Sequence, residues 1–472
     1  MFLRVTIFFP GKNLLAWWLD PEICRFSFLH DFCFERKFMS TSSARDVVIT
    51  GIGIFSPVGI GRENFWSGIS SGKTGIQKVQ LLPFIGTPDC VGGEVRDFND
   101  ESAKKIYLKS LRKSLKVMCR DIQLGVAAAI QAMEDAGLSP GSVPADRLGI
   151  DFGANLMSSP PEVLVGGVMK SLSEQNGSPE FDFDKWGPEG LRGMEPLWLL
   201  CYLPNMPGCH IGIALDARGP NNSITHDEAS GCLAIAEAAN IIRRDRADVM
   251  VTGVTGTRLQ IAKACQYSRW DTLAAGPAET RCRPFDRDRS GEVLAEASCT
   301  LILEAREHAE ARGARILGTV LGCGASTVAG RDGTVDEATA VYQAATAAAG
   351  NAGIAAADIG HVNAGASGHP QRDQLEAAGI RRFLGSSADT VPVTAIKSYM
   401  GSSGSGAGLC EIAASLLGLQ QGVVPKTLNY SHSDPTAPLN VVHGQHLPVT
   451  NRTFLKTSVT RMGQASAVVI QS

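Results

Sequence analysis

Short apolar segments that alternate with helical segments are the feature that most constrains this chain of 472 residues. The pattern occurs twice. The first run has strand-like segments at 46–54, 148–153, 248–253 and 299–304, with helical periodicity at 120–137, 229–245 and 305–312. The second has strands at 316–324, 361–364, 391–395 and 465–470, with helices at 335–350, 372–384 and 406–420. This alternation predicts an α/β fold of helix-covered, largely parallel sheets, duplicated in halves 45–305 and 306–472.

Charge and cysteine usage exclude several classes of protein. The formal net charge is −3, which gives no electrostatic basis for binding nucleic acid. The twelve cysteines are scattered without a CxxC pair, so we predict neither a disulfide framework nor a zinc site. Reduced thiols, and therefore a cytoplasmic location, are the simplest interpretation. We predict no metal and no cofactor.

The first 44 residues form an extension before the first predicted strand. The opening MFLRVTIFF is apolar but short, and proline, glycine and lysine follow it. It is too short for a membrane span or for a typical secretory signal. We predict that Met39 is the true start and that residues 1–38 are a mis-assigned extension. A peripheral membrane anchor, with Trp17 and Trp18 at the interface, is the alternative.

A second irregular region covers residues 158–205. It carries several prolines and glycines and no clear periodicity. We predict an insertion that lies over the core.

The segment GPNNSITHDEASGC at 219–232 predicts a sharp elbow between a short strand and an Ala-rich helix. A side chain at such an elbow projects into a pocket, where the helix also directs its unpaired N–H groups. A cysteine there would have a lowered pKa and would be a good nucleophile. This chain instead places Glu228 at the elbow, between Asp227 and Ser230.

This segment resembles the nucleophile elbow of β-ketoacyl-ACP synthases, which reads GPN-x-S-I-(S/T)-x-A-C-A. The spacing continues without a gap to Asp248, so Glu228 falls on the position of the family's cysteine. Further similar blocks lie at 47–57, 283–296, 301–313, 362–367 and 397–402. The resemblance covers about 46–472, except 158–205, and implies a thiolase-like fold of two stacked mixed sheets with helices between and outside them (αβαβα).

The family's chemistry is a decarboxylative Claisen condensation that uses one cysteine and two histidines. Carried over by position, this machinery is replaced by Glu228, Gly365 and Ser402. None of the three can supply a thiolate or an imidazole. Lys397 matches the family's lysine, and Asp373 and Glu376 match its acidic positions.

The family's mobile loop with a gating phenylalanine also differs. Arg461 takes the place of that gate, and we expect it to pair with Glu228 across the pocket.

Loss of these residues resembles chain-length factors, which keep the fold, lack the cysteine and pair with an active ketosynthase. The resemblance therefore predicts a non-condensing partner subunit in fatty acid or polyketide synthesis. Its expected partners are an acyl carrier protein and an active ketosynthase in a heterodimer, or a second copy in a homodimer. The alternatives are a working 3-oxoacyl-ACP synthase, a malonyl-ACP decarboxylase that uses Glu228, and an acyl-binding homodimer without chemistry.

Structural roles are the simpler interpretation for several of these residues. His226, Asp227 and Glu228 are adjacent, and adjacent residues rarely converge on one metal ion. We expect Glu228 to be an anion held by helix N–H groups. Cys232, one turn later, is expected to be a core cysteine.

Two residues near the predicted histidine positions have similarly modest expectations. His369 is expected to be a loop residue beside a proline, although it could turn toward the pocket. Lys397 is expected to remain as an ion-pair partner of Glu376.

Overall fold

The two runs of strands form sheets with the same order. The computed structural model describes residues 45–80, 88–270 and 273–472, so the predicted extension and start site lie outside the described residues. The first sheet contains β1 (Val47–Ser56), β5 (Leu148–Ala154), β8 (Asn221–Ile224), β9 (Val249–Thr257) and β10 (Glu296–Ala305). The second contains β11 (Gly318–Thr327), β12 (His361–Asn363), β13 (Val393–Thr394), β16 (Thr453–Val459) and β17 (Gln464–Gln471).

In each sheet, the strand that comes fifth along the chain lies beside the first and is antiparallel to both of its neighbours. The orders are β1-β10-β9-β5-β8 and β11-β17-β16-β12-β13. The strands β1 and β11 pair over only two positions, Val48 with Thr319 and Ile49 with Gly318. The shared order confirms the predicted duplication of the fold, whereas the exact boundary at 305 stays a prediction.

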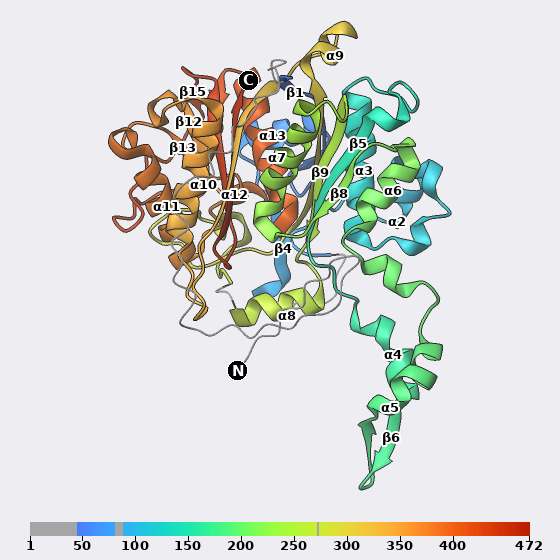
Figure 1. The fold of residues 1–472 in the computed structure, drawn as a ribbon. Coiled ribbons are helices and arrows are strands. Elements are labelled where there is room, and N and C mark those ends of the chain that lie inside the picture. The colour runs from blue at the N-terminus through green and yellow to red at the C-terminus, as the bar shows by residue number, and fades with distance from the viewer. Residues whose placement is uncertain (1–44, 81–87, 271–272) are drawn as a thin grey trace, which may run out of the picture. The chain divides into compact units, whose positions relative to one another are not determined.

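Helices lie between and outside the two sheets, as Figure 1 shows. The helices α7 (Ser230–Arg243) and α13 (Ala407–Gln420) fill the middle layer and share one apolar core with strands of both sheets. The outer faces are covered by α3 (Arg120–Asp135) and α6 (Met206–Leu215) on one side, and by α10 (Glu337–Ala352) and α11 (Pro370–Leu384) on the other. The predicted αβαβα arrangement is therefore confirmed.

How much of each helix is buried depends on whether it lies in the middle layer or in an outer layer. The helix α13 is buried from Ala407 to Leu419 because sheets and helices surround it, whereas α3 exposes one polar side. The helix α10 begins where the side chain of Asp336 accepts a hydrogen bond from the Thr339 N–H, and it ends at Gly353, whose φ is +68°. These signals place the predicted helices within a few residues of their observed bounds.

The remaining elements border the sheets or form short pairs. They are β2 (Gly59–Ile60), α1 (Arg62–Ser71), β3 (Ile76–Lys78), β4 (Val91–Gly93), α2 (Asp100–Ser102), α8 (Ile261–Trp270), α9 (Arg306–Ala311), α12 (Lys397–Met400), β14 (Val423–Val424) and β15 (Leu447–Pro448).

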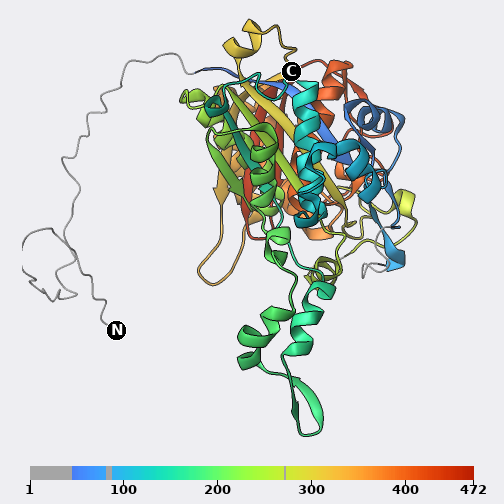
Figure 2. The same cartoon turned by 90° about the vertical axis from the view of Figure 1, so that its right-hand side faces the viewer.

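Residues 161–202 project from the rest of the fold as an arm (Figures 1 and 2). The arm contains α4 (Pro161–Lys170), the hairpin β6 (Leu172–Gln175) and β7 (Ser178–Phe181), α5 (Phe183–Lys185) and several helical turns up to Tyr202. The arm packs on itself. Its backbone segments approach so closely that a Cβ at Gly166 would lie 2.4 Å from the carbonyl oxygen of Gly193. The prediction of an insertion lying over the core is therefore wrong for this segment.

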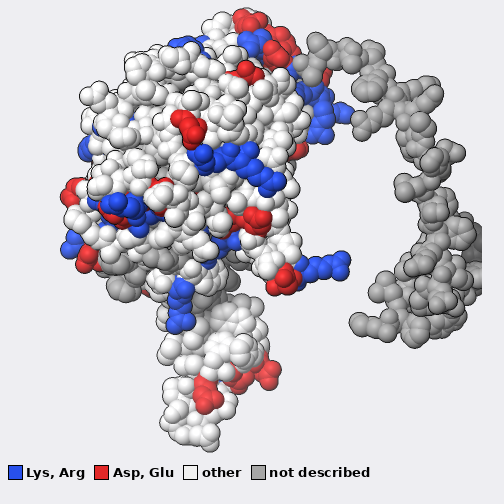
Figure 3. Space-filling model, turned by 90° about the vertical axis from the view of Figure 1, so that its left-hand side faces the viewer, with Lys and Arg blue, Asp and Glu red and all other residues white. Residues whose placement is uncertain are grey.

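Charges on the face shown in Figure 3 are intermixed, with no large area of one sign. Within the described residues, no helix is both long and apolar enough to cross a bilayer.

Candidate active site

Four residues that the sequence predicts at active-site positions line one small cavity. Glu228 lies at the elbow between β8 and α7, Gly365 follows β12, and Lys397 and Ser402 lie in and just after α12. The cavity measures about 10 Å³, which is room for about one water molecule. Its other lining residues are Ala366, Ser367, Arg372, Asp373, Glu376 and Val459.

Arg258, just beyond the end of β9, holds the carboxylate of Glu228. Its Nη2 lies 2.5 Å from Glu228 Oε1 and donates to it. The arginine side chain is only 1% exposed. The expectation that helix N–H groups hold Glu228 therefore missed its main partner, a buried guanidinium.

Arg258 also contacts Ser402, which the sequence predicts at the position of the family's second histidine. Its Nη1 donates to Ser402 Oγ at 2.6 Å and pairs with Glu292 Oε2 at 3.2 Å. Its Nη2 pairs with Asp227 at 3.0 Å, and the guanidinium lies over the ring of Tyr267. One side chain thus connects the elbow with the loop that contains Ser402.

Arg372, at the start of α11, is the second cation of the site. It pairs with Glu292 and with Glu337 at 3.2 Å each, and it donates to the Val459 carbonyl at 3.0 Å. Glu292 therefore bridges the two arginines.

The charges of this network set the pKa values of its acids. Burial raises the pKa of Glu228, but the charges of Arg258 and Arg372 outweigh it and lower that pKa to about 2. Burial raises the pKa of Asp227, and Arg258 offsets this only in part. Burial also raises the pKa of Glu337 against the effect of Arg372. Glu228 is therefore ionised at neutral pH, which suits an ion-pair partner better than a general base.

The backbone at Gly365 is held from both sides. Its N–H donates to Glu376 Oε1 at 2.8 Å, and its carbonyl accepts from Lys397 Nζ at 2.7 Å. A Cβ on Gly365 would lie 3.3 Å from Glu376 Oε1, so a side chain there would need small shifts of its neighbours.

We expected Lys397 to pair with Glu376, but it pairs with Glu411 instead. The Lys397 Nζ lies 2.6 Å from Glu411 Oε1, and Lys456 Nζ lies 2.7 Å from Glu411 Oε2. All three side chains are buried in the middle of the fold. Glu376 instead accepts from Gly365 and, at 2.9 Å, from Thr457 Oγ1.

Three other predicted residues have structural roles. Asp373 accepts backbone hydrogen bonds from Phe285, Ser367 and Gly368, and burial raises its pKa to about 6. His369 Nδ1 accepts from the N–H groups at the start of α11 and does not line the cavity. Cys232 is buried in the middle-layer core, and burial raises its pKa.

The elbow itself is fixed by polar contacts. Asp227 has φ +44°, and Ser230 Oγ accepts from the His226 N–H at 3.0 Å. Ser405 Oγ lies 3.1 Å from Ser230 Oγ and donates to the Asp227 carbonyl. Gly404 permits this contact, since its φ is +69° and a Cβ there would lie 2.3 Å from Asp227 Oδ1.

Arg461 is not the partner of Glu228. Its guanidinium lies over the ring of Trp270, and Nη2 donates to the Trp270 carbonyl at 3.2 Å. The expected pair fails because Arg258, from the first half, already occupies the carboxylate.

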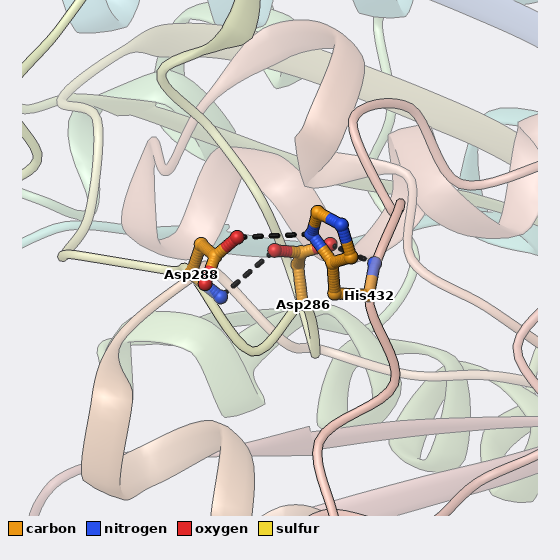
Figure 4. Close-up of side chains that lie close together, drawn as sticks. All are labelled: Asp286, Asp288 and His432. Carbon is orange, nitrogen blue, oxygen red and sulfur yellow. Dashed lines mark hydrogen bonds and ion pairs between the residues drawn. The ribbon is translucent and has the colours of Figure 1, made fainter.

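A separate group, Asp286, Asp288 and His432, has spacing that could hold a metal ion (Figure 4). Asp286, however, accepts backbone hydrogen bonds from Asp288, Ser431 and His432. Asp288 pairs with His432 Nδ1 at 2.9 Å. Each oxygen of Asp286 thus already has a structural role.

Four charged residues of this region were not predicted from the sequence: Arg258, Arg372, Glu292 and Glu411. Arg258 follows the predicted strand at 248–253, whose end faces the same edge as the elbow, so its position in the chain was a usable signal. Its pairing with Glu228 depends on the packing of segments 30 residues apart.

Comparisons with known proteins agree with this geometry. The chain matches the family models "Beta-ketoacyl synthase, N-terminal domain" over residues 44–309 and "Beta-ketoacyl synthase, C-terminal domain" over residues 317–431. It is 30% identical to the tetracenomycin polyketide synthase ketoacyl synthase alpha subunit of Streptomyces glaucescens, covering 86% of this chain and 92% of that protein. It is 29% identical to 3-oxoacyl-[acyl-carrier-protein] synthase 2 of Coxiella burnetii, covering 90% and 98%.

Solved structures share the fold. The ishigamide ketosynthase/chain length factor superposes with a TM-score of 0.77 at 24% identity, covering 91% of this chain and 100% of that chain. A type II polyketide ketosynthase in complex with its acyl-carrier protein gives 0.76 at 24% identity, with the same coverage. With both halves matched by family models, this chain belongs to the β-ketoacyl synthase family.

Proposed function

We propose that this chain is a non-condensing member of the family. In this role it serves as an accessory subunit to an active ketosynthase and a carrier protein in fatty acid or polyketide synthesis. The supporting observation is the ion pair of Glu228 with Arg258, which occupies the elbow and the Ser402 position together.

Condensation needs a nucleophile that stores the acyl group and donors that stabilise the enolate. A carboxylate that attacks a thioester would give a mixed anhydride, which is a poor store for an acyl group. Gly365 has no side chain, and the Ser402 hydroxyl already accepts a hydrogen bond from Arg258. Removing a single oxyanion donor typically costs about 10²–10³ in rate, and here both histidine positions lack an imidazole.

The size of the cavity supports the same proposal. A space of about 10 Å³ has no room for a malonyl group unless Arg258 or its partners move. Moving Arg258 would leave Glu228 and Glu292 buried without this cation, which is costly.

A malonyl-ACP decarboxylase that uses Glu228 is the second candidate. The only feature that favours a decarboxylase is the position of Glu228 at the elbow. It is disfavoured by the lowered pKa of Glu228, which leaves a weak base already bound to a cation.

Radiolabelled malonyl-ACP tests the site directly. We expect the purified protein to release no labelled CO₂ and to show no acyl adduct in its intact mass. A Glu228→Cys variant should stay inactive, because Gly365 and Ser402 remain. CO₂ release that is lost in Glu228→Ala would establish the decarboxylase instead.

The accessory role is tested by capture. The tagged chain should retain an active ketosynthase from the source cells, and adding it to that ketosynthase should change the amount or chain length of the product. Products that are identical with and without the chain would rule out the accessory role.

A further inference from the structure

A second cavity lies between α7 and β11, at the opposite end of α7 from the active site. Its volume is about 660 Å³, against about 10 Å³ at the active site. Arg243, the last residue of α7, lines this cavity, whereas Glu228 lies just before the helix begins. A helix of 14 residues is about 20 Å long, so the two sites are separate. The volume is in the range of small-molecule binding sites.

The topology of the two sheets explains why this cavity exists. The strand β17 pairs with β11 along its length, whereas β1 pairs with β11 only at Gly318 and Thr319. From Val320 onward, the side of β11 toward β1 is therefore not covered by another strand. One face of α7 forms the facing wall with Ala236, Asn240 and Arg243. The start of α9 also lines the cavity, which places it at the end of the fold where α9 projects in Figure 1.

Arg243 supplies hydrogen-bond donors and an unpaired charge to this cavity. Its Nη2 donates to the carbonyls of Val320 at 3.0 Å and Leu321 at 3.4 Å, and these bonds fix the guanidinium. Among the described residues, no carboxylate lies within ion-pair distance of Arg243, and its Nε and Nη1 have no hydrogen-bond partner. Arg45 and Arg306, in contrast, already pair with acids. A fixed guanidinium whose charge is unpaired is suited to bind an anion.

The lining as a whole is cationic and polar. Its charged residues are three arginines and one aspartate: Arg45, Arg243, Arg306 and Asp46. A phosphate monoester carries about 1.5–2 negative charges at pH 7, so it matches this lining better than a carboxylate with its single charge. Three exposed amide side chains can donate hydrogen bonds to a polar ligand and accept them from it: Asn240, Asn351 and Gln471.

The chemistry of the lining indicates binding rather than catalysis. Among the described residues that line the cavity there is no histidine, and the one thiol is that of Cys323. Burial raises the pKa of Cys323 to about 12, so its thiol is neutral at pH 7 and is not a nucleophile.

We propose that this cavity binds a small organic phosphate ester, with the phosphate group on Arg243 and the polar body of the ligand against the amide side chains. The inference goes beyond the proposed function and does not depend on it, because the cavity shares no lining residue with the active site.

Matched ligands test which group of the ligand is recognised. Isothermal titration calorimetry on the full-length protein compares glucose 6-phosphate with glucuronate and glucose, which keep the sugar ring but carry a carboxylate or no charge. AMP and adenosine form a second pair with a different body. We expect at least one of the two esters to bind with a Kd of about 1 mM or tighter. Its counterpart without phosphate should bind at least about tenfold more weakly.

Two variants test whether this binding occurs in the cavity. Arg243→Gln removes the charge but keeps a donor, and Ala325→Phe fills the cavity from β11 without a change in charge. Each should raise the Kd of the ester by about tenfold or more. The matched controls, Arg244→Gln and Thr327→Phe, change exposed neighbours that do not line the cavity and should keep the wild-type Kd. Thermal unfolding checks that each variant is folded.

Four results would overturn the inference. One is that neither ester binds more tightly than its uncharged counterpart, and another is that glucuronate binds as tightly as glucose 6-phosphate. Binding that survives both Arg243→Gln and Ala325→Phe would place the phosphate elsewhere on the chain. An equal loss in Arg243→Gln and Arg244→Gln would show general electrostatic attraction in place of a built site.

Discussion

Replacing Arg258 by methionine tests the central feature of the site. Methionine keeps much of the apolar stem but removes the cation that pairs with Asp227, Glu228 and Glu292. Breaking a buried ion pair by removing one partner costs about 3–5 kcal/mol, because the other charge is left buried and unpaired. We expect Arg258→Met to lose a free energy of unfolding of that order at pH 7. Arg372 remains near Glu292 and Glu228 and limits the loss.

The pH dependence of that loss distinguishes charge from packing. In the wild type, Glu228 has a pKa near 2 in the fold and an ordinary value when unfolded. The contribution of Glu228 to the free energy of unfolding is therefore complete above pH 4.5 and is lost only as the pH falls toward 2. In the variant, the unpaired carboxyls have raised pKa values, so protonation stabilises the fold and the deficit shrinks between pH 7 and pH 5.

Urea unfolding at pH 7 and pH 5 measures both effects. Arg244→Met is the control, since this exposed arginine pairs with Glu237 only at 3.4 Å and should matter by less than about 1 kcal/mol. A second-site change, Glu228→Gln in the Arg258→Met background, should recover part of the loss. A deficit below about 1 kcal/mol, or one equal at both pH values, would show that this ion pair does not stabilise the site.

Three further predictions concern other buried charges. Asp151 on β5 is fully buried, and burial raises its pKa to about 8. Asp151→Asn should therefore stabilise the fold by about 1–3 kcal/mol at pH 9, and this gain should become smaller toward pH 5, as measured by thermal unfolding. An equal gain at pH 9 and pH 5 would show that ionisation of Asp151 does not cause it. Glu411→Gln should cost about 3–5 kcal/mol in urea unfolding, because two buried lysines lose their anion, whereas Glu411→Asp should cost less. Gly365→His should leave the protein folded but inactive with malonyl-ACP, since Arg258 still holds Ser402; activity in that single variant would refute a closed site.

The fold could be predicted because its signals are local. Alternating β-branched strands and Ala-rich helices, ended by glycines, reveal two similar halves without any tertiary information. The strand β16 was missed, and the reason is Lys456, which lies buried in its middle. A lysine in an apolar run normally argues against a buried strand, but here Glu411 from α13 neutralises it.

The site could be predicted only as far as its elements are contiguous. The elbow around Glu228 is one segment, so its geometry follows from the strand, the turn and the helix. The identity of the cation that neutralises Glu228 depends on three segments meeting at one edge, and the predicted partner, Arg461, was the wrong one. The arm was misjudged for a related reason: proline and glycine suggested irregular chain, whereas the glycines allow α4 to pack closely on the segment around Gly193.

The residues at the predicted active-site positions form one consistent set. A buried carboxylate at the elbow is stable only with a cation beside it, and Arg258 supplies that cation from the end of β9. A guanidinium in that place also reaches the Ser402 hydroxyl, so a larger or cationic imidazole there would meet Arg258. Changing residue 228 alone therefore removes one of the three acids that pair with Arg258, and changing residue 402 alone crowds that same cation. Restoring condensation would require changes at residues 228, 258, 365 and 402 together, which is why single substitutions are expected to report on stability rather than on catalysis.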